Sequence, residues 1–189
     1  KFILMNLTKN IQIPKVGFGT YLISNEEVYS CVYNAICSGY RHIDTAEVYD
    51  NEIGVGKGIR DALKDLNLKR DDIFITTKMW PGNEILGEEL KTYETTIKAL
   101  NISLKKLKLD YVDLYLIHGP FAKGQRLDQW RALLDLNQQG KTKTIGVSNY
   151  NVHHIQEVIS SGMKLPVANQ LEIHPWSQKP ILLEFLKKK

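Results

Sequence analysis

Four residues with side chains that can carry or orient a proton lie at or just beyond the ends of predicted β-strands: Asp44, Tyr49, Lys78 and His118. A tyrosine hydroxyl has a reference pKa of about 10, too high for easy proton donation near neutral pH. An adjacent ammonium group stabilises the phenolate and makes donation easier, and a carboxylate can keep that ammonium charged and oriented. Together, Asp44, Lys78 and Tyr49 are therefore predicted to form a proton-donating site.

His118 ends the apolar run Leu114 to Ile117, and Gly119-Pro120 then stops the strand. A histidine at that place can donate a hydrogen bond to a substrate oxygen. Each of the four side chains also has an ordinary structural role, because strand-end aspartates cap loops, lysines reach solvent and lone histidines satisfy polar contacts. Their joint placement at strand ends favours the functional interpretation.

Short apolar runs alternate along the chain with longer amphipathic stretches, which predicts repeated parallel βα units. The strands are expected near Val16–Gly19, Arg41–Asp44, Ile73–Lys78, Val112–His118, Thr142–Val147 and Val167–Glu172. The helices are expected near Glu26–Ser38, Glu52–Leu66, Glu88–Leu107, Leu127–Gln139, Val152–Ser160 and Lys179–Lys188. Before them, Phe2–Leu7 and Ile11–Val16 predict an N-terminal β-hairpin.

Polar or special residues follow every one of these strands. In a β/α barrel the loops after the strands form one rim, where chemistry is built from several strands. We therefore predict an α/β protein with a parallel, TIM-type barrel of which about six of eight βα units are present. Residues 1–189 are expected to form one such partial domain.

The composition excludes several other classes of protein. Basic residues exceed acidic ones by only 4 and are scattered, which argues against nucleic acid as the main partner. No apolar run approaches the roughly 18 residues of a membrane span, so neither a membrane partner nor a signal peptide is expected, and a cytoplasmic location is the simplest expectation. Cys31 and Cys37 are expected to be reduced thiols.

Two long segments resemble the aldo-keto reductase family. They are Gly39-Tyr40-Arg41-His42-Ile43-Asp44-Thr45-Ala46, leading to Tyr49, Glu52 and Val55-Gly56, and Lys143-Thr144-Ile145-Gly146-Val147-Ser148-Asn149-Tyr150. Shorter matching pieces follow the family's order: Gly17-Phe18-Gly19-Thr20, Thr77-Lys78, Leu116-Ile117-His118 and Asn169-Gln170-Leu171-Glu172-Ile173-His174-Pro175. The chain resembles the first two thirds of such an enzyme.

The resemblance implies a role for each matched residue. Tyr49 resembles the proton donor, Lys78 its activating neighbour, Asp44 the partner of that lysine and His118 the residue that orients the carbonyl group. The residues implied to bind the cofactor are Thr20, Tyr21, Asp44, Ser148, Asn149 and Gln170, of which the last three hold the nicotinamide carboxamide. Those implied to contact substrate are Tyr21, Tyr49, Trp80 and His118.

The implied reaction reduces a small-molecule aldehyde or ketone to an alcohol, with NADPH as the hydride source and no metal ion. Gly119 departs from the aromatic or larger residue that the family often has there, which implies a pocket that is wider on that side.

The sequence stops in the sixth predicted helix, before the family's last two βα units, which implies a weaker hold on the cofactor. Three explanations are open: an incomplete record of a full enzyme, a truncated form whose unpaired strand edges bind another chain, or an inactive barrel that serves as a binding or structural module. The oligomeric state is not predicted. A barrel hydrolase or isomerase that uses His118 and Asp44 differently is a further alternative, which bound zinc would favour.

Overall fold

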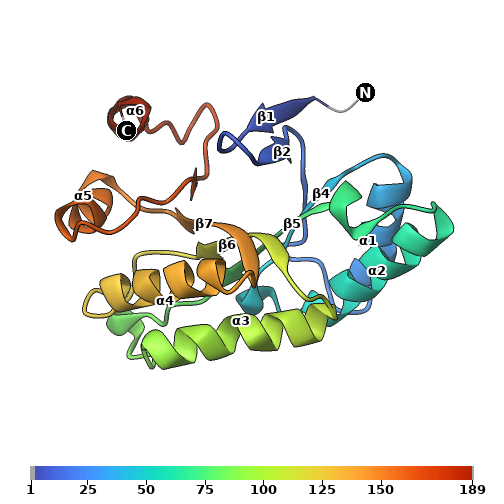
Figure 1. Ribbon diagram of the computed structural model, residues 1–189, viewed down its shortest axis with the longest axis horizontal. Helices are drawn as coiled ribbons and strands as arrows, with labels where there is room; N and C mark the ends of the chain where they lie inside the picture. Colours follow the sequence, from blue (N-terminus) through green and yellow to red (C-terminus); the bar gives the residue numbers. More distant parts are fainter. Residues whose placement is uncertain (1–2, 189) are drawn as a thin grey trace.

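The structure is a computed structural model that describes residues 3–188, so Phe2, the expected start of the hairpin, lies outside the described range. Its centre is a curled parallel sheet in which sequential strands are neighbours, in the order β3-β4-β5-β6-β7-β8 (Figure 1). The strands are β3 (Phe18–Gly19), β4 (His42–Asp44), β5 (Phe74–Met79), β6 (Val112–Ile117), β7 (Thr142–Ser148) and β8 (Asn169–Gln170). The predicted partial barrel is confirmed.

The connecting helices cover the convex side of the sheet, with α3 and α4 beneath β5 to β7 in Figure 1 and α1 packed against α2. The helices are α1 (Val28–Cys37), α2 (Glu52–Asp65), α3 (Tyr93–Leu107), α4 (Arg126–Gln138), α5 (Val152–Ser160) and α6 (Pro180–Lys187). Three 3-10 turns, η1 (Glu47–Tyr49), η2 (Arg70–Asp72) and η3 (Glu84–Leu86), lie in the loops. Among the described helices, none combines the length and the apolar character needed to cross a membrane.

Alternation along each strand sends side chains to two different cores. On β5, Ile75 and Met79 join the large apolar cluster between sheet and helices, whereas Phe74 joins a smaller cluster on the concave face with Leu114 and Leu116. Lys78 lies on the concave side of the same strand, between the outward-facing neighbours Thr77 and Met79. The sheet therefore delivers polar side chains to the concave face while its other face is sealed by helices.

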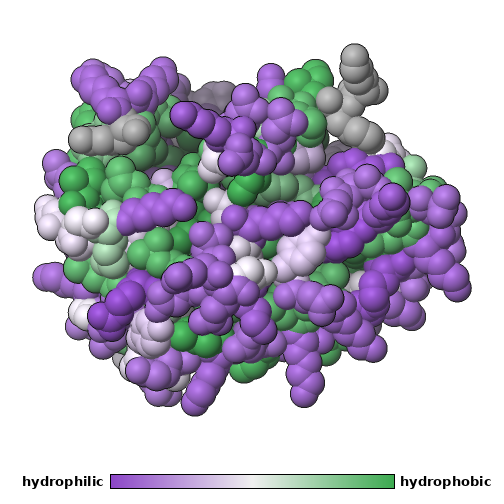
Figure 2. Space-filling view, viewed as in Figure 1, coloured by the Kyte–Doolittle hydropathy of each residue, from purple (hydrophilic) through white to green (hydrophobic). Residues whose placement is uncertain are grey.

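The N-terminal hairpin closes one end of the concave face. Strands β1 (Leu4–Asn6) and β2 (Gln12–Pro14) pair antiparallel, and Ile13 packs on the concave apolar cluster. Ile3 and Met5 are exposed, and Figure 2 shows apolar residues at the top of the view, near the position of β1 in Figure 1. The predicted hairpin is confirmed within the described residues.

Several elements are shorter than the sequence pattern predicts. The helix expected from Glu88 begins at Tyr93, because Thr92 accepts a hydrogen bond from Thr95 N–H and so caps the first turn. The strand expected over Val167–Glu172 is reduced to Asn169–Gln170. A glycine with a left-handed backbone angle lies just beyond the ends of α1, α4 and α5: Gly39, Gly140 and Gly162.

Candidate active site

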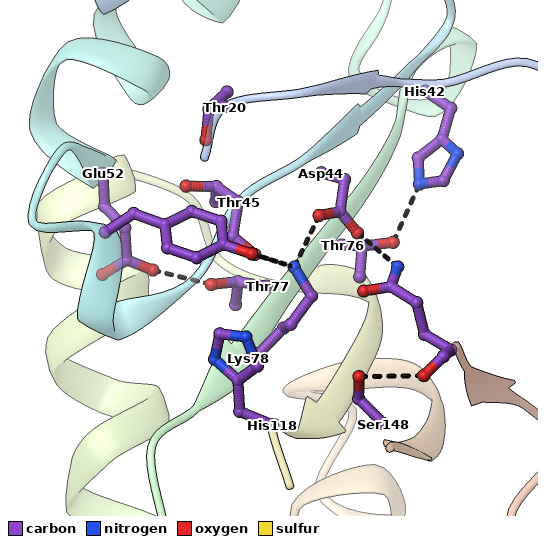
Figure 3. Close-up of polar contacts among 12 residues, drawn as sticks. Thr20, His42, Asp44, Thr45, Glu52, Thr76, Thr77, Lys78, His118 and Ser148 are labelled. Carbon is purple, nitrogen blue, oxygen red and sulfur yellow. Dashed lines mark hydrogen bonds and ion pairs between the residues drawn. The ribbon is translucent and has the colours of Figure 1, made fainter. Parts of the chain in front are cut away.

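Lys78 is the centre of a buried polar cluster at the carboxyl ends of β4 and β5 (Figure 3). Its Nζ donates to Asp44 Oδ1 at 2.5 Å, to the Thr45 carbonyl at 2.9 Å and to the Tyr49 hydroxyl at 3.2 Å. Lys78 is only 1% exposed, so its charge is compensated by these contacts rather than by water. The three predicted proton-handling residues are thus in direct contact.

The parallel register of β4 and β5 explains this proximity. Asp44 lies opposite Thr76, and Lys78 follows Thr76 by two residues, so Thr76 and Lys78 lie on the same face of β5. Asp44 and Lys78 therefore reach one another across neighbouring strands. The 3-10 turn η1 then returns the chain over the strand ends and places Tyr49 against the ammonium group.

His118 lies directly after β6 and completes the cluster. Its ring centroid is 5.6 Å from that of Tyr49 and 5.8 Å from that of Trp80, both in edge-on geometry. Burial, together with the positive charge of Lys78, lowers the pKa of His118 to about 4, although Asp44 opposes the shift. The imidazole is therefore neutral near pH 7 and presents one N–H donor rather than a charge.

This depressed pKa predicts a pH-dependent loss of stability. The unfolded chain takes up the His118 proton below pH 6.5 more readily than the folded chain, so the folded state loses stability as the pH falls from about 6.5 towards 4. Burial lowers the pKa of His42 and His154 too. The contribution of His118 is therefore obtained by comparing a His118 variant with the parent protein. The urea midpoint should fall less between pH 7.5 and pH 5 in His118→Gln than in the parent. An equal fall in both proteins would contradict the assignment.

Three uncharged polar residues at or just after the ends of β7 and β8 border the cluster. Gln170 Nε2 donates to Asp44 Oδ2 at 2.8 Å, and Ser148 Oγ donates to the Gln170 carbonyl at 3.0 Å. Asn149 donates to the His118 carbonyl at 3.0 Å and to Ser148 Oγ at 3.1 Å. Both amide groups act as donors in these contacts, so each keeps an oxygen able to accept from an N–H₂ group.

A cavity of about 950 Å³ lies above the cluster and extends along the concave face. Its walls include most of the residues that the sequence singled out: Tyr21, Asp44, Tyr49, Trp80, His118, Ser148, Asn149 and Gln170. Thr20 is not among them. It is fully buried, and its hydroxyl points to Asn51 Oδ1 at 3.5 Å, whereas its neighbour Tyr21 is exposed and its ring centroid is 5.1 Å from that of Tyr49.

The space beside Gly119 is filled rather than open. A Cβ atom on Gly119 would lie 2.2 Å from Cε2 of Phe121, whose ring centroid is 5.4 Å from that of Trp80. An aromatic ring two residues later in the chain thus occupies the room that the small residue leaves. The position of a Gly119 side chain is thus taken by Phe121, and a wider cavity on this side stays a prediction.

Asn51 is a buried polar residue that the sequence interpretation missed. Its amide nitrogen donates to the carbonyls of Thr20 and Ile23 at 2.9 and 3.0 Å, and its oxygen accepts from Thr45 Oγ1 at 3.2 Å. Asn51 thereby ties the loop that carries Tyr21 to the loop between β4 and η1. Asn51 is the residue before α2, yet its side chain makes no capping bond to that helix.

Replacing Asn51 with alanine should destabilise the protein by roughly 1–3 kcal/mol, because buried carbonyl groups would lose their donors. Asn101 is an exposed asparagine on α3, so Asn101→Ala is the matched control and should change stability by less than about 0.5 kcal/mol. Urea unfolding of both variants measures the difference. Equal midpoints would show that the Asn51 contacts contribute nothing.

Comparison with known proteins identifies the family to which the chain belongs. The model of the aldo/keto reductase family matches residues 15–189. Glyoxal reductase of Bacillus subtilis (strain 168) is 42% identical over 184 residues, covering 97% of this chain and 62% of the relative. Methylglyoxal reductase DkgA of Escherichia coli (strain K12) is 42% identical over 168 residues, covering 88% of this chain and 56% of the relative. The chain thus spans 56% to 62% of the length of these two curated relatives.

Solved structures give the same result. An aldo/keto reductase from Brucella melitensis superimposes with a TM-score of 0.88 at 42% identity, over 100% of this chain and 70% of that one. A Bombyx mori aldo-keto reductase in complex with NADP has a TM-score of 0.88 at 36% identity, over 100% of this chain and 64% of that one. Family model, relatives and fold confirm the resemblance seen in the sequence motifs: this chain belongs to the aldo/keto reductase family.

Proposed function

We propose that the protein reduces aldehydes and ketones to alcohols, with NADPH as the hydride source and Tyr49 as the proton donor. The observation that carries this proposal is the buried contact of Lys78 with Asp44, Thr45 and Tyr49 beside a neutral His118. A structural ion pair alone would need no phenol hydroxyl beside the ammonium group and no aromatic cavity above it.

The residues at the cavity rim fit a nicotinamide. Ser148, Asn149 and Gln170 offer hydroxyl and amide groups without charge, which match the donor and acceptor groups of a carboxamide. One solved relative is a complex with NADP, which supports this choice of cofactor. When bound, the reduced nicotinamide supplies the hydride that the protein's own side chains cannot provide.

The protein side chains then handle the carbonyl oxygen. The Tyr49 hydroxyl and the His118 N–H are placed to donate hydrogen bonds to it and to stabilise the negative charge that develops there. As that charge develops, the Tyr49 proton passes to the oxygen. Lys78 stabilises the phenolate that remains, and Asp44 holds Lys78 in place. This arrangement does not favour the alternative of a non-catalytic module.

Small dicarbonyl compounds are the substrates that the relatives suggest, since two of them are named for glyoxal and methylglyoxal. The experiment is to mix the intact protein with NADPH and methylglyoxal and to follow the loss of reduced-nicotinamide absorbance. Steady oxidation that depends on both compounds is the expected result. If NADPH neither is oxidised nor has its fluorescence quenched at high micromolar concentration, the binding-module alternative is favoured instead.

A further inference from the structure

The backbone of Trp80 is held on both sides by an ion pair that the proposed reaction does not use. Trp80 N–H donates to Glu47 Oε2 at 2.9 Å, and Lys91 Nζ donates to the Trp80 carbonyl at 2.8 Å. Lys91 and Glu47 lie 3.1 Å apart. The three residues form a closed ring of contacts, which we call the Trp80 clamp: Glu47, Trp80 and Lys91.

The clamp joins the wall of the cavity to the turn that carries Tyr49. Glu47 begins η1 and Tyr49 ends it, so the same short turn contacts Trp80 and Lys78. The side chains of Glu47 and Lys91 are only 27% and 21% exposed, which limits the screening of their attraction by water. The distance between the phenol and the indole is therefore set partly by this pair.

Further hydrogen bonds hold the two ends of the loop that carries Trp80 together, so the clamp belongs to a well-anchored segment. Lys91 N–H donates to the Pro81 carbonyl at 3.0 Å, and buried Gln129 on α4 donates to the carbonyls of Pro81 and Lys91 at 3.1 and 2.9 Å. The indole Nε1 donates to Glu88 within the same loop at 2.7 Å. Every polar atom of Trp80, which means its backbone N–H, its carbonyl oxygen and its indole Nε1, therefore makes a hydrogen bond.

We infer that Glu47 and Lys91 are positioning residues that set the Trp80 indole against His118 and thereby select carbonyl compounds with a planar aromatic group. The indole lies edge-on to His118 and is backed by Phe121, so an aromatic group bonded to a carbonyl held at His118 meets an aromatic wall. A small dicarbonyl compound reaches that wall much less. The selection of aromatic carbonyl compounds rests on the proposed function, whereas the positioning of the Trp80 indole by Glu47 and Lys91 does not.

The test compares Lys91→Met, which removes both contacts that Lys91 Nζ makes in the clamp, with Lys91→Arg, which keeps a charged donor. Lys106→Met is the matched control, because Lys106 pairs with Asp50 at the end of η1, 3.6 Å apart, without a contact to Trp80. Two readouts are taken. One is the ratio of KM values for nitrobenzaldehyde and methylglyoxal, and the other is the fluorine NMR spectrum of fluorotryptophan-labelled protein.

The chain has 3 tryptophans, and Trp80→Phe assigns the resonance of Trp80 by its disappearance. In Lys91→Met that resonance should shift or broaden while the other two stay in place, and KM for nitrobenzaldehyde should rise about tenfold relative to methylglyoxal, as loss of a charged hydrogen bond allows. Lys91→Arg should restore both readouts, and Lys106→Met should change neither.

An unmoved Trp80 resonance in Lys91→Met would overturn the positional inference, and a moved resonance with an unchanged KM ratio would overturn the role in specificity. If the parent protein reduces neither compound, the proposed function fails, and the NMR spectrum still decides the positional inference. A disturbance of all three resonances would mean general loss of structure and would also overturn a specific clamp.

Discussion

Tyr49→Phe is expected to lower kcat for carbonyl reduction by about a thousandfold or more, within the range that a positioned general acid contributes. The substitution removes one hydroxyl group, whose contact is the 3.2 Å hydrogen bond from Lys78. Lys78 keeps Asp44 and the Thr45 carbonyl as acceptors, so the fold and the affinity for NADPH should be preserved. Steady-state kinetics and nicotinamide fluorescence measure the two quantities separately.

The matched control for this prediction is Tyr21→Phe. Tyr21 lines the same cavity and its ring contacts that of Tyr49, yet its hydroxyl is not part of the Lys78 cluster. Its loss should change kcat by less than about threefold, as expected for a group that takes no part in proton transfer. Equal effects of the two substitutions would argue that no tyrosine proton is transferred in the rate-determining step.

Lys78→Met should have the second largest effect, because it damages both turnover and stability. Without the ammonium group, the Tyr49 phenolate loses its stabilising charge and kcat should fall by at least about a hundredfold. The Asp44 carboxylate, whose side chain is 16% exposed, loses its ion-pair partner, and stability should fall by about 3–5 kcal/mol. Chemical unfolding and kinetics measure the two losses on the same variant.

A second substitution separates these two consequences. Asp44→Asn in the Lys78→Met background removes the unpaired charge, so the double variant should recover much of the lost stability. It should not recover turnover, because the ammonium group remains absent. Recovery of both would mean that Lys78 acts through folding alone, and recovery of neither would mean that the carboxylate charge is not what destabilises the single variant.

The strand-end placement of Asp44, Lys78 and His118 was predictable because β/α barrels gather the residues after their strands at one rim. A short apolar run in the sequence indicates each strand. The polar residue that ends the run can be identified without information about distant contacts. Gly39 and Gly140 likewise mark helix ends through their backbone freedom. These features depend on local sequence, so the sequence carries them.

Features that depend on contacts between distant segments were not predictable. Asn51 bonds to Thr20 and Ile23, which lie about thirty positions earlier in the chain, and Glu47 meets Trp80 across a similar separation. Thr20, which the resemblance assigns to the cofactor, is buried and contacts Asn51 across the same separation. Phe121 fills the space beside Gly119 through a turn that no periodicity marks.

The most direct test of the account is to follow a deuterium atom from specifically deuterated NADPH into the product. With the intact protein and methylglyoxal, the account predicts an alcohol that carries the deuterium on the former carbonyl carbon, formed by the parent protein and not by Tyr49→Phe within the same time. An alcohol without deuterium, or equal deuterium transfer by both proteins, would contradict the proposal that this site reduces carbonyl groups with Tyr49 as its acid.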